Sequence, residues 1–252
     1  MVLANRKMSP TWLPSCFHKK HPGLQGKILC LPEAADMQRL KIIGNSGAAR
    51  ECYWLFQDMC AADASLKTRC RFHGFLSWRN YSGDLKKLQN MFLGDALDYS
   101  INDEDIFVIG IGNPNLREDV YVTMKSRGAS FFTLCHPLAD INPDSNVGEA
   151  NIFQRNSTVF CDVSLGNANY LNGAVNLSHD ATVGDYNFVG PFSLILGNCS
   201  VGSRNLLAAR TTLLPGARIG DDNIIAPSSV IYKGCRNNCR LAGNPALTIG
   251  TV

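Results

Sequence analysis

The sequence places a histidine directly before an aspartate, at His179 and Asp180, in the stretch LSHDATVGDY. A carboxylate beside an imidazole orients the ring and makes it more basic, which suits a general base near neutral pH. The simplest alternative is a surface histidine whose acidic neighbour has no role. The elements that hold the pair decide between these two interpretations.

The pair lies within a six-residue repeat. From Ile141 to Ile231 every sixth residue is apolar, without an exception. The fourth residue after each of these is small or is asparagine, and glycine often follows the apolar residue directly. A period of six matches neither the turn of an α-helix nor the alternation of a simple strand.

This repeat predicts a solenoid. One aliphatic side chain per hexad points inward and stacks on its counterpart in the next coil, and three hexads close one triangular coil. We expect the glycines and asparagines to adopt unusual backbone angles at the corners. A β-sandwich would instead show period-two alternation and turns at varied spacing. The sequence therefore predicts a left-handed parallel β-helix over residues 141–235, with smooth faces because no insertion interrupts the run.

The preceding part of the chain predicts a small α/β unit. Apolar strands are expected at 38–43, 70–77, 105–112 and 130–137, with helices from the first strand to about residue 62 and at 116–127. This alternation indicates a parallel sheet in a Rossmann-like unit over residues 38–137. Residues 1–37 show little periodicity, and we expect them to form an N-terminal extension.

A glycine-rich turn, GNSGAARE, joins the first strand to the first helix. Its candidate ligand-binding residues are Gly44, Asn45, Ser46, Gly47 and Arg50. The backbone N–H groups of such a turn and of a helix N-terminus form a natural cradle for phosphate. A dinucleotide site would need a third glycine and an acid after the second strand, where Ser77, Trp78 and Arg79 stand. We therefore favour a nucleotide or another anionic group other than NAD over a purely structural turn.

Composition and charge are those of an ordinary globular protein. The 252 residues carry a net charge of +3, so no strong attraction to nucleic acid or to an anionic membrane is expected. Neither a membrane-spanning run nor a signal peptide is predicted, and we expect a cytoplasmic protein. The ten cysteines show no paired framework, which indicates reduced thiols. Cys235 and Cys239 in CRNNC are interpreted as free thiols, because two metal ligands alone are weak evidence for a metal site.

The sequence from residue 40 to residue 246 resembles the left-handed β-helix sugar acetyltransferases of the sialic acid O-acetyltransferase type, a group that includes bacterial nucleotide-amino-sugar N-acetyltransferases. The matching segments occur in the order of the family. They are IIGNSGAARE, IGNPNLR, the HP pair at His136, LNGAVNLSHDATVGDYNFVGP, LLPGARIGDDNIIAPSSVI and the closing LAGNPA.

This resemblance implies that the two units have different functions. The α/β unit would bind a sugar nucleotide, and the β-helix domain at 138–252 would form a homotrimer with acetyl-CoA in the groove between adjacent prisms. His179 matches the catalytic base, which removes a proton from the acceptor amine or hydroxyl as it attacks the thioester, and Asp180 would orient it. Backbone amides would stabilise the tetrahedral oxyanion.

The resemblance also implies further contacts. Asn172 matches a polar residue near the acceptor. Acetyl-CoA contacts are implied at Asn187, Gly197, Ala209, Gly243 and Pro245. Many relatives carry a second histidine where this chain has Asn187, whose amide would donate a hydrogen bond to the acetyl carbonyl. Relatives also often have acidic residues where Ser77 and Trp78 stand, so the identity of the nucleotide is left open. The identity of the acyl group and the choice between N- and O-acetylation are open as well.

Two other functions fit parts of the sequence. A non-catalytic nucleotide-binding scaffold would use the glycine-rich turn and the solenoid but leave His179 and Asp180 without a purpose. A zinc hydratase on the same solenoid would need three histidine ligands, and the repeat contains one. We therefore predict an acetyl-CoA-dependent sugar acetyltransferase without a metal.

Overall fold

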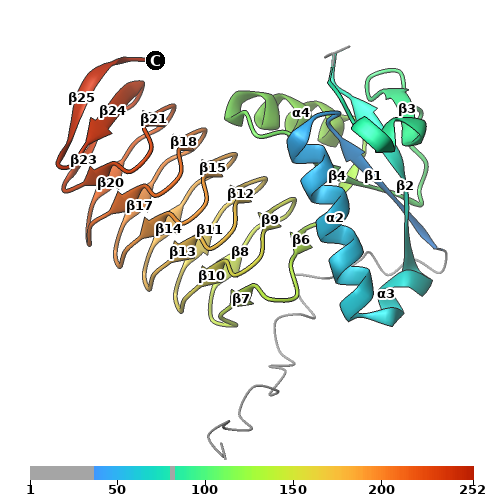
Figure 1. The fold of residues 1–252 in the computed structure, drawn as a ribbon, viewed down its shortest axis with the longest axis horizontal. Helices are drawn as coiled ribbons and strands as arrows, with labels where there is room; N and C mark the ends of the chain where they lie inside the picture. The colour runs from blue at the N-terminus through green and yellow to red at the C-terminus, as the bar shows by residue number, and fades with distance from the viewer. Residues whose placement is uncertain (1–36, 80–82) are drawn as a thin grey trace, which may run out of the picture.

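The computed structural model describes residues 37–79 and 83–252, arranged as an α/β unit packed on one end of a three-sided β-helix (Figure 1). The extension expected at 1–37 lies, apart from Met37, outside the described residues. The fold class expected from the sequence is confirmed, and the helical prism is of the left-handed hexapeptide type.

The α/β unit is built on one parallel sheet with strand order β3-β2-β1-β4-β5. Its elements are β1 (Gln38–Ile43), α2 (Gly47–Ala62), α3 (Ala64–Arg69), β2 (Cys70–Ser77), η1 (Lys86–Met91), β3 (Phe92–Asp95), β4 (Asp105–Ile109), α4 (Pro114–Ser126) and β5 (Ser130–Phe131). From β1 the chain proceeds to β2 and β3 on one side of the sheet and then to β4 and β5 on the other side, so the order of connection reverses between β1 and β4. In such sheets ligands bind at the carboxyl ends of the strands beside this reversal. This is the edge from which the glycine-rich turn leaves β1.

The last strand expected in this unit, at 130–137, is instead divided between the two units. β5 pairs with β4, whereas β6 (Leu134–Cys135) pairs with β9 (Ile152–Phe153) of the β-helix. Leu134 faces α2 and Cys135 packs against the interior of the prism, because successive side chains of a strand point to opposite sides. The first β-helix strand therefore lies inside the segment predicted for the α/β unit.

The prism has three parallel faces of two-residue strands. Face 1 contains β6, β9, β12 (Tyr170–Leu171), β15 (Phe188–Val189), β18 (Leu206–Leu207), β21 (Ile224–Ile225), β24 (Cys239–Gly243) and the antiparallel β25 (Ala246–Thr251). Face 2 contains β7 (Asp140–Ile141), β10 (Thr158–Val159), β13 (Asn176–Leu177), β16 (Leu194–Ile195), β19 (Thr212–Leu213) and β22 (Val230–Ile231). Face 3 contains β8 (Asn146–Val147), β11 (Ser164–Leu165), β14 (Thr182–Val183), β17 (Ser200–Val201), β20 (Arg218–Ile219) and β23 (Gly234–Cys235).

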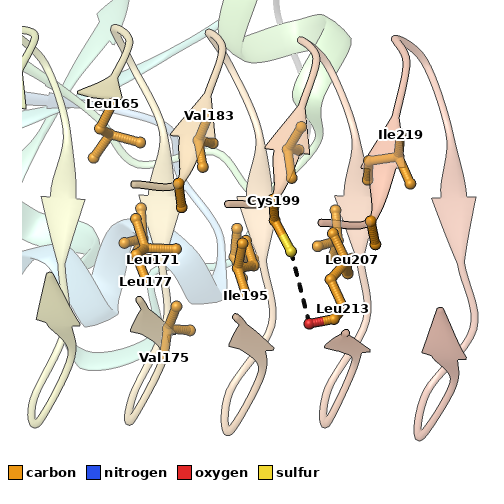
Figure 2. Close-up of a cluster of buried hydrophobic side chains, with 14 of the residues drawn as sticks. Leu165, Leu171, Val175, Leu177, Val183, Ile195, Cys199, Leu207, Leu213 and Ile219 are labelled. Atoms are coloured by element: carbon orange, nitrogen blue, oxygen red, sulfur yellow. Dashed lines mark hydrogen bonds between the residues drawn. The ribbon is translucent and has the colours of Figure 1, made fainter. Parts of the chain in front are cut away.

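The second residue of each strand forms the core. Side chains such as Leu171, Leu177 and Val183 are almost completely buried and stack from coil to coil (Figure 2). Burying an aliphatic side chain of this size contributes about 1.5–3 kcal/mol, so the regular ladder stabilises the prism along its whole length. Cys199 lies inside the same core, with its thiol 3.8 Å from the Leu213 carbonyl oxygen and 3.1 Å from that of Leu214 (Figure 2).

The corner residues differ from the expectation. From Val147 onward, the left-handed backbone angles fall on the third residue after each inward side chain, mostly on non-glycine residues such as Asp180 (φ 59°) and Arg204 (φ 57°). The glycines instead allow the backbones of adjacent coils to approach closely, since a Cβ on Gly184 would lie 2.9 Å from the backbone of Gly202 in the next coil. The asparagines before the face 1 strands are buried and hydrogen-bonded to one another.

The α/β unit packs on the first coils of face 1, with α2 beside β6 (Figure 1). Arg117 of α4 is completely buried in this contact, where Nε donates to the Ala168 carbonyl at 2.7 Å and Nη1 to the carbonyls of Ile109 and Ile111 at 2.8 Å. Burial lowers the pKa of Arg117 to about 10. The guanidinium therefore ties the end of β4 to the prism, which fixes the sheet edge relative to the β-helix.

Two sequence expectations concern membranes and thiols. None of the helices in 37–79 and 83–252 is long and apolar enough to cross a bilayer. The eight cysteines in this part of the chain are free, Cys235 and Cys239 among them.

Candidate active site

His179 and Asp180 lie at the corner between face 2 and face 3, between β13 and β14. The left-handed backbone of Asp180 turns the chain there, and the two consecutive side chains meet with 2.7 Å between His179 Nδ1 and Asp180 Oδ2. An ionised carboxylate only accepts hydrogen bonds, so Nδ1 carries the hydrogen and Nε2 keeps its lone pair. Both side chains are more than half exposed, which leaves Nε2 open to a substrate.

Gly197 occupies the position of His179 in the next coil. A Cβ on Gly197 would lie 2.5 Å from Cε1 and 2.6 Å from Nε2 of His179. The missing side chain therefore leaves the space in which the imidazole ring lies. The sequence predicted Gly197 as an acetyl-CoA contact, and the structure gives it a position next to His179.

A second feature is a cavity of about 600 Å³ between α2, η1 and the first coils of the prism. Pockets of this size accommodate small ligands of several hundred daltons. The lining residues are Gly47, Arg50, Glu51, Trp54, Leu55, Asp58, Leu85, Lys86, Lys87, Leu88, His136, Gln154 and Arg155. Gly47 and Arg50 were expected at a binding site, whereas most of the others were missed.

The end of the cavity at the N-terminus of α2 is cationic. Arg50 and Lys87 form no ion pair with any residue that the structure describes, whereas Lys86 pairs with Asp84. Lys87 Nζ lies 5.3 Å from the ring centroid of Trp54, which is half exposed. An unpaired cation in the first turn of a helix, here Arg50, favours an anionic ligand group, and Lys87 adds a second positive charge farther along the cavity.

The opposite end of the cavity meets the corner between face 1 and face 2. There Asp58 Oδ2 lies 3.3 Å from His136 Nε2 and 3.4 Å from Arg155 Nη2. His136 Nδ1 accepts the Leu138 N–H at 2.9 Å. Burial lowers the pKa of His136, and the Arg155 guanidinium lowers it further, so the ring is neutral at pH 7.

Glu51 stands between the two ends of the cavity. The Tyr170 hydroxyl donates to Glu51 Oε2 at 2.7 Å, and Gln154 Nε2 donates to the same hydroxyl at 2.9 Å. Burial raises the pKa of Tyr170, which keeps the donating proton on the phenol. The carboxylate of Glu51 is therefore held by the prism although it belongs to α2.

The residues of the glycine-rich turn lie in two places, some against the loop after β4 and some at the cavity along α2. A Cβ on Gly44 (φ 133°) would lie 2.4 Å from the Gly110 carbonyl oxygen, so this glycine permits the turn to touch the loop after β4. Asn45 is buried next to it, and Ser46 begins α2 without a side-chain capping bond. Of the five predicted residues, Gly47 and Arg50 reach the cavity.

Two asparagines were expected near the reacting groups. Asn172 follows β12 at the corner between face 1 and face 2, and its Oδ1 accepts the Gly173 N–H at 2.7 Å. Asn187 is instead completely buried inside the prism. Its Nδ2 donates to Asn169 Oδ1 and the Gly202 carbonyl, and its Oδ1 accepts from Asn205. The expected contact of Asn187 with an acetyl group is corrected, because no polar atom of this side chain faces a surface.

The other predicted acetyl-CoA residues are spread over the prism. Ala209 lies at the corner between face 1 and face 2, and the exposed Gly243 and Pro245 lie at the turn of the C-terminal hairpin. One chain does not gather them around His179. Their role in binding acetyl-CoA stays a prediction.

The missed cavity residues carried a partial signal. Glu51, Trp54 and Asp58 recur at three- and four-residue spacing on one side of α2, opposite its buried side, and an exposed tryptophan between two acids is unusual. Gln154 and Arg155 follow an inward residue of the repeat, and only the packing of the two units brings them to α2. Within the part of the chain that the structure describes, no three histidine, cysteine or acidic side chains converge to hold a metal.

Comparisons with known proteins agree on the fold. No protein-family model matches the sequence, and no curated protein is detectably similar to it in sequence. Perosamine N-acetyltransferase from Caulobacter crescentus, solved with CoA and GDP-perosamine, is 21% identical with a TM-score of 0.72 over 86% of this chain and 98% of that chain. The acetyltransferase domain of PglB from Neisseria gonorrhoeae, solved with acetyl coenzyme A, is 17% identical with a TM-score of 0.74 over 85% of this chain and 100% of that one.

A third structure, WeeI from Acinetobacter baumannii, is 16% identical with a TM-score of 0.57 over 84% of this chain and 100% of that chain. The first two neighbours are left-handed β-helix sugar acetyltransferases. At these identities the likeness establishes the fold, including the order of the α/β unit and the prism.

Proposed function

We propose that this chain, which has the fold of left-handed β-helix sugar acetyltransferases, transfers an acetyl group from acetyl-CoA to an amino or hydroxyl group of a nucleotide-linked sugar. The observation that carries the proposal is the His179–Asp180 pair, with 2.7 Å between Nδ1 and Oδ2 and an open Nε2. The solved neighbours hold CoA with GDP-perosamine, or acetyl coenzyme A, which supports the choice of both substrates.

The reaction needs one base. Nε2 of His179 removes the proton of the acceptor N–H or O–H as that atom attacks the thioester carbonyl. Asp180 stabilises the imidazolium that forms, and backbone N–H groups stabilise the oxyanion. When the tetrahedral intermediate collapses, the C–S bond breaks and the imidazolium returns the proton to the sulfur of CoA.

The acceptor site in this proposal is the cavity along α2. Its end at the helix N-terminus, with Gly47 and the cation Arg50, suits the phosphates of a sugar nucleotide. Its volume of about 600 Å³ is sufficient for the sugar and the phosphates. The half-exposed indole of Trp54 adds an apolar wall.

The positions of the cavity and the base favour a homotrimer. His179 lies at the corner between face 2 and face 3, whereas the cavity lies at the corner between face 1 and face 2. One six-residue face separates these corners by about 15–20 Å. We propose that a neighbouring copy presents its His179 to the cavity, with acetyl-CoA in the groove between the two prisms.

The test is an assay with acetyl-CoA and GDP-, UDP- and dTDP-linked amino sugars and sialic acid, in which thiol release and product mass identify the acceptor. His179→Ala is expected to lower turnover by about two to four orders of magnitude, the range of a general base. His73→Ala, an exposed histidine of β2, serves as the control.

Two outcomes would contradict the proposal in different ways. A His179→Ala variant with the wild-type rate would show that another group acts as the base. Absence of thiol release with every acceptor, together with calorimetry that shows no binding of acetyl-CoA, would favour the non-catalytic scaffold.

A further inference from the structure

We propose that Glu51 binds the sugar ring of the acceptor by accepting a hydrogen bond from a ring hydroxyl or amino group. This inference rests on the proposed function, in which the cavity along α2 holds a nucleotide-linked sugar. It assigns the sugar to one end of that cavity and names the carboxylate that recognises it.

The cavity has a direction. It follows one side of α2 from Gly47 through Glu51 and Trp54 to Asp58, a length of about 16 Å at 1.5 Å per residue. Gly47 lies at the carboxyl edge of the sheet, next to the point between β1 and β4 where the strand order reverses. Asp58 lies against the prism, where it contacts His136 and Arg155.

A nucleotide sugar has its phosphates between the nucleoside and the sugar. Nucleosides bind to sheets of this topology at the carboxyl edge, beside the reversal of strand order. The phosphates then fall at the N-terminus of α2, beside the unpaired cation Arg50. This order leaves the sugar in the part of the cavity that Glu51, Gln154 and the prism enclose.

Glu51 presents a fixed acceptor to that part of the cavity. The Tyr170 hydroxyl accepts from Gln154 and donates to Oε2 of Glu51, so it holds the carboxylate from one side. No side chain or backbone group in 37–79 and 83–252 donates a hydrogen bond to Oε1. A carboxylate oxygen accepts only, and it therefore selects a hydroxyl or an amino group of the ligand.

The support under Glu51 is rigid. Tyr170 is completely buried, with the ring of Phe188 at 5.3 Å and the guanidinium of Arg117 at 5.6 Å from its centroid. A polar group held in this way loses little conformational freedom when it binds a ligand. Asp58, the other carboxylate of the cavity, contacts the cationic or imidazole groups of Arg155 and His136 through Oδ2 at the far end of the cavity, away from the helix N-terminus.

Glu51→Gln tests the inference with little change of shape. The side-chain oxygen of glutamine keeps the hydrogen bond from Tyr170, while its NH₂ group replaces the acceptor that faces the cavity. Calorimetry would compare the affinity for GDP-perosamine with that for GDP, and likewise for UDP- and dTDP-linked amino sugars with UDP and dTDP. Loss of a hydrogen bond to a charged group lowers affinity about ten- to hundredfold, and we expect this loss for the bound nucleotide sugar.

The free nucleoside diphosphate provides the internal control. Its affinity is expected to stay unchanged or to rise, because removal of a negative charge cannot weaken the binding of an anion. Glu104→Gln is the matched variant, since Glu104 lies outside the cavity, in a surface ion pair with Arg39. Glu51→Asp, which keeps the charge but shortens the side chain, is expected to lose affinity for the nucleotide sugar by an intermediate factor.

The outcomes separate this inference from the proposed function. Equal losses for the nucleotide sugar and the nucleoside diphosphate would place Glu51 at the nucleotide and overturn the inference. If Glu51→Gln binds the nucleotide sugar and the nucleoside diphosphate with unchanged affinity, the sugar binds elsewhere and the inference is likewise overturned. If the unaltered protein binds none of the nucleotide sugars, the proposed function fails and this inference fails with it.

Discussion

The imidazole of His179 is oriented by two neighbours of different kinds. Asp180 holds Nδ1 through a hydrogen bond, and Gly197 contributes only the absence of a side chain. The first interaction is polar and visible in the sequence as an adjacent pair. The second depends on a residue that is eighteen positions away along the chain but directly next to the ring in the coil above.

Gly197→Ala is expected to displace the imidazole ring of His179, the proposed base, without unfolding the protein. The new Cβ would lie 2.5–2.6 Å from ring atoms of His179, and the ring is exposed enough to move away. A displacement of about 1 Å lowers the rate of a positioned group by about a hundredfold. Steady-state kinetics should therefore show a large fall in kcat.

The stability of the same variant distinguishes this effect from a general loss of structure. Gly197 does not need a left-handed backbone angle, so its free energy of unfolding is expected to change by less than about 1 kcal/mol. Gly250→Ala, where no atom lies within 4 Å of the new Cβ, is the matched control. An unchanged kcat in Gly197→Ala would mean that the ring position seen in the structure is not the catalytic one.

At the scale of elements, the corner between face 3 and face 1 is held by a ladder of buried asparagines. Each amide bonds to the coil before or after it, as in the bonds of 2.8 and 3.0 Å from Asn205 to Asn187 Oδ1. The ladder members are Asn151, Asn169, Asn187, Asn205 and Asn223. They satisfy backbone groups that the tight corner removes from water, which explains their burial without a ligand.

Asn187→Ala is expected to destabilise the prism. The substitution leaves Asn169, Gly202 and Asn205 without their partner groups in a region that excludes water. Unsatisfied buried groups cost about 1–3 kcal/mol each, and a total loss of about 2–5 kcal/mol is expected in denaturant unfolding. Asn176→Ala, on the outer side of β13, should change stability far less. Loss of acetyl-CoA binding at unchanged stability would instead return Asn187 to the site.

The repeat shows what sequence can and cannot predict here. Each inward residue meets a residue of the same kind in the next coil, so the period is visible without the structure. Asn187 was expected to contact an acetyl group because relatives carry a histidine at this position. Its recurrence with Asn169 and Asn205 at eighteen-residue spacing was the signal for a structural role. β1, α2 and β2 follow from apolar patterns, whereas β3 is short and β6 depends on a pairing with β9. The cavity combines three separate segments, which no local pattern connects.

At the scale of the whole molecule, the cavity along α2 and the side chain of His179 lie at different corners of the prism. Arg117 and the contacts of α2 fix the α/β unit on face 1, so the cavity cannot swing toward the corner that bears His179. A closed ring of identical copies solves this geometric problem, because each interface joins two different corners of neighbouring prisms. The proposal of a closed ring therefore follows from the placement of the site, and the resemblance implies that the ring has three copies.

Mixing two inactive variants tests this arrangement. One copy would carry His179→Ala, and the other would carry Arg50→Glu with Lys87→Glu, which repels an anionic acceptor. If the site is shared between copies, each trimer purified through tags on both chains contains one site in three with both residue sets intact. Activity should then return to about a third of the wild-type rate. A site within one chain would leave the mixed oligomers as inactive as the two variants alone. Sedimentation of the unaltered protein as a monomer would contradict the shared site independently of any activity.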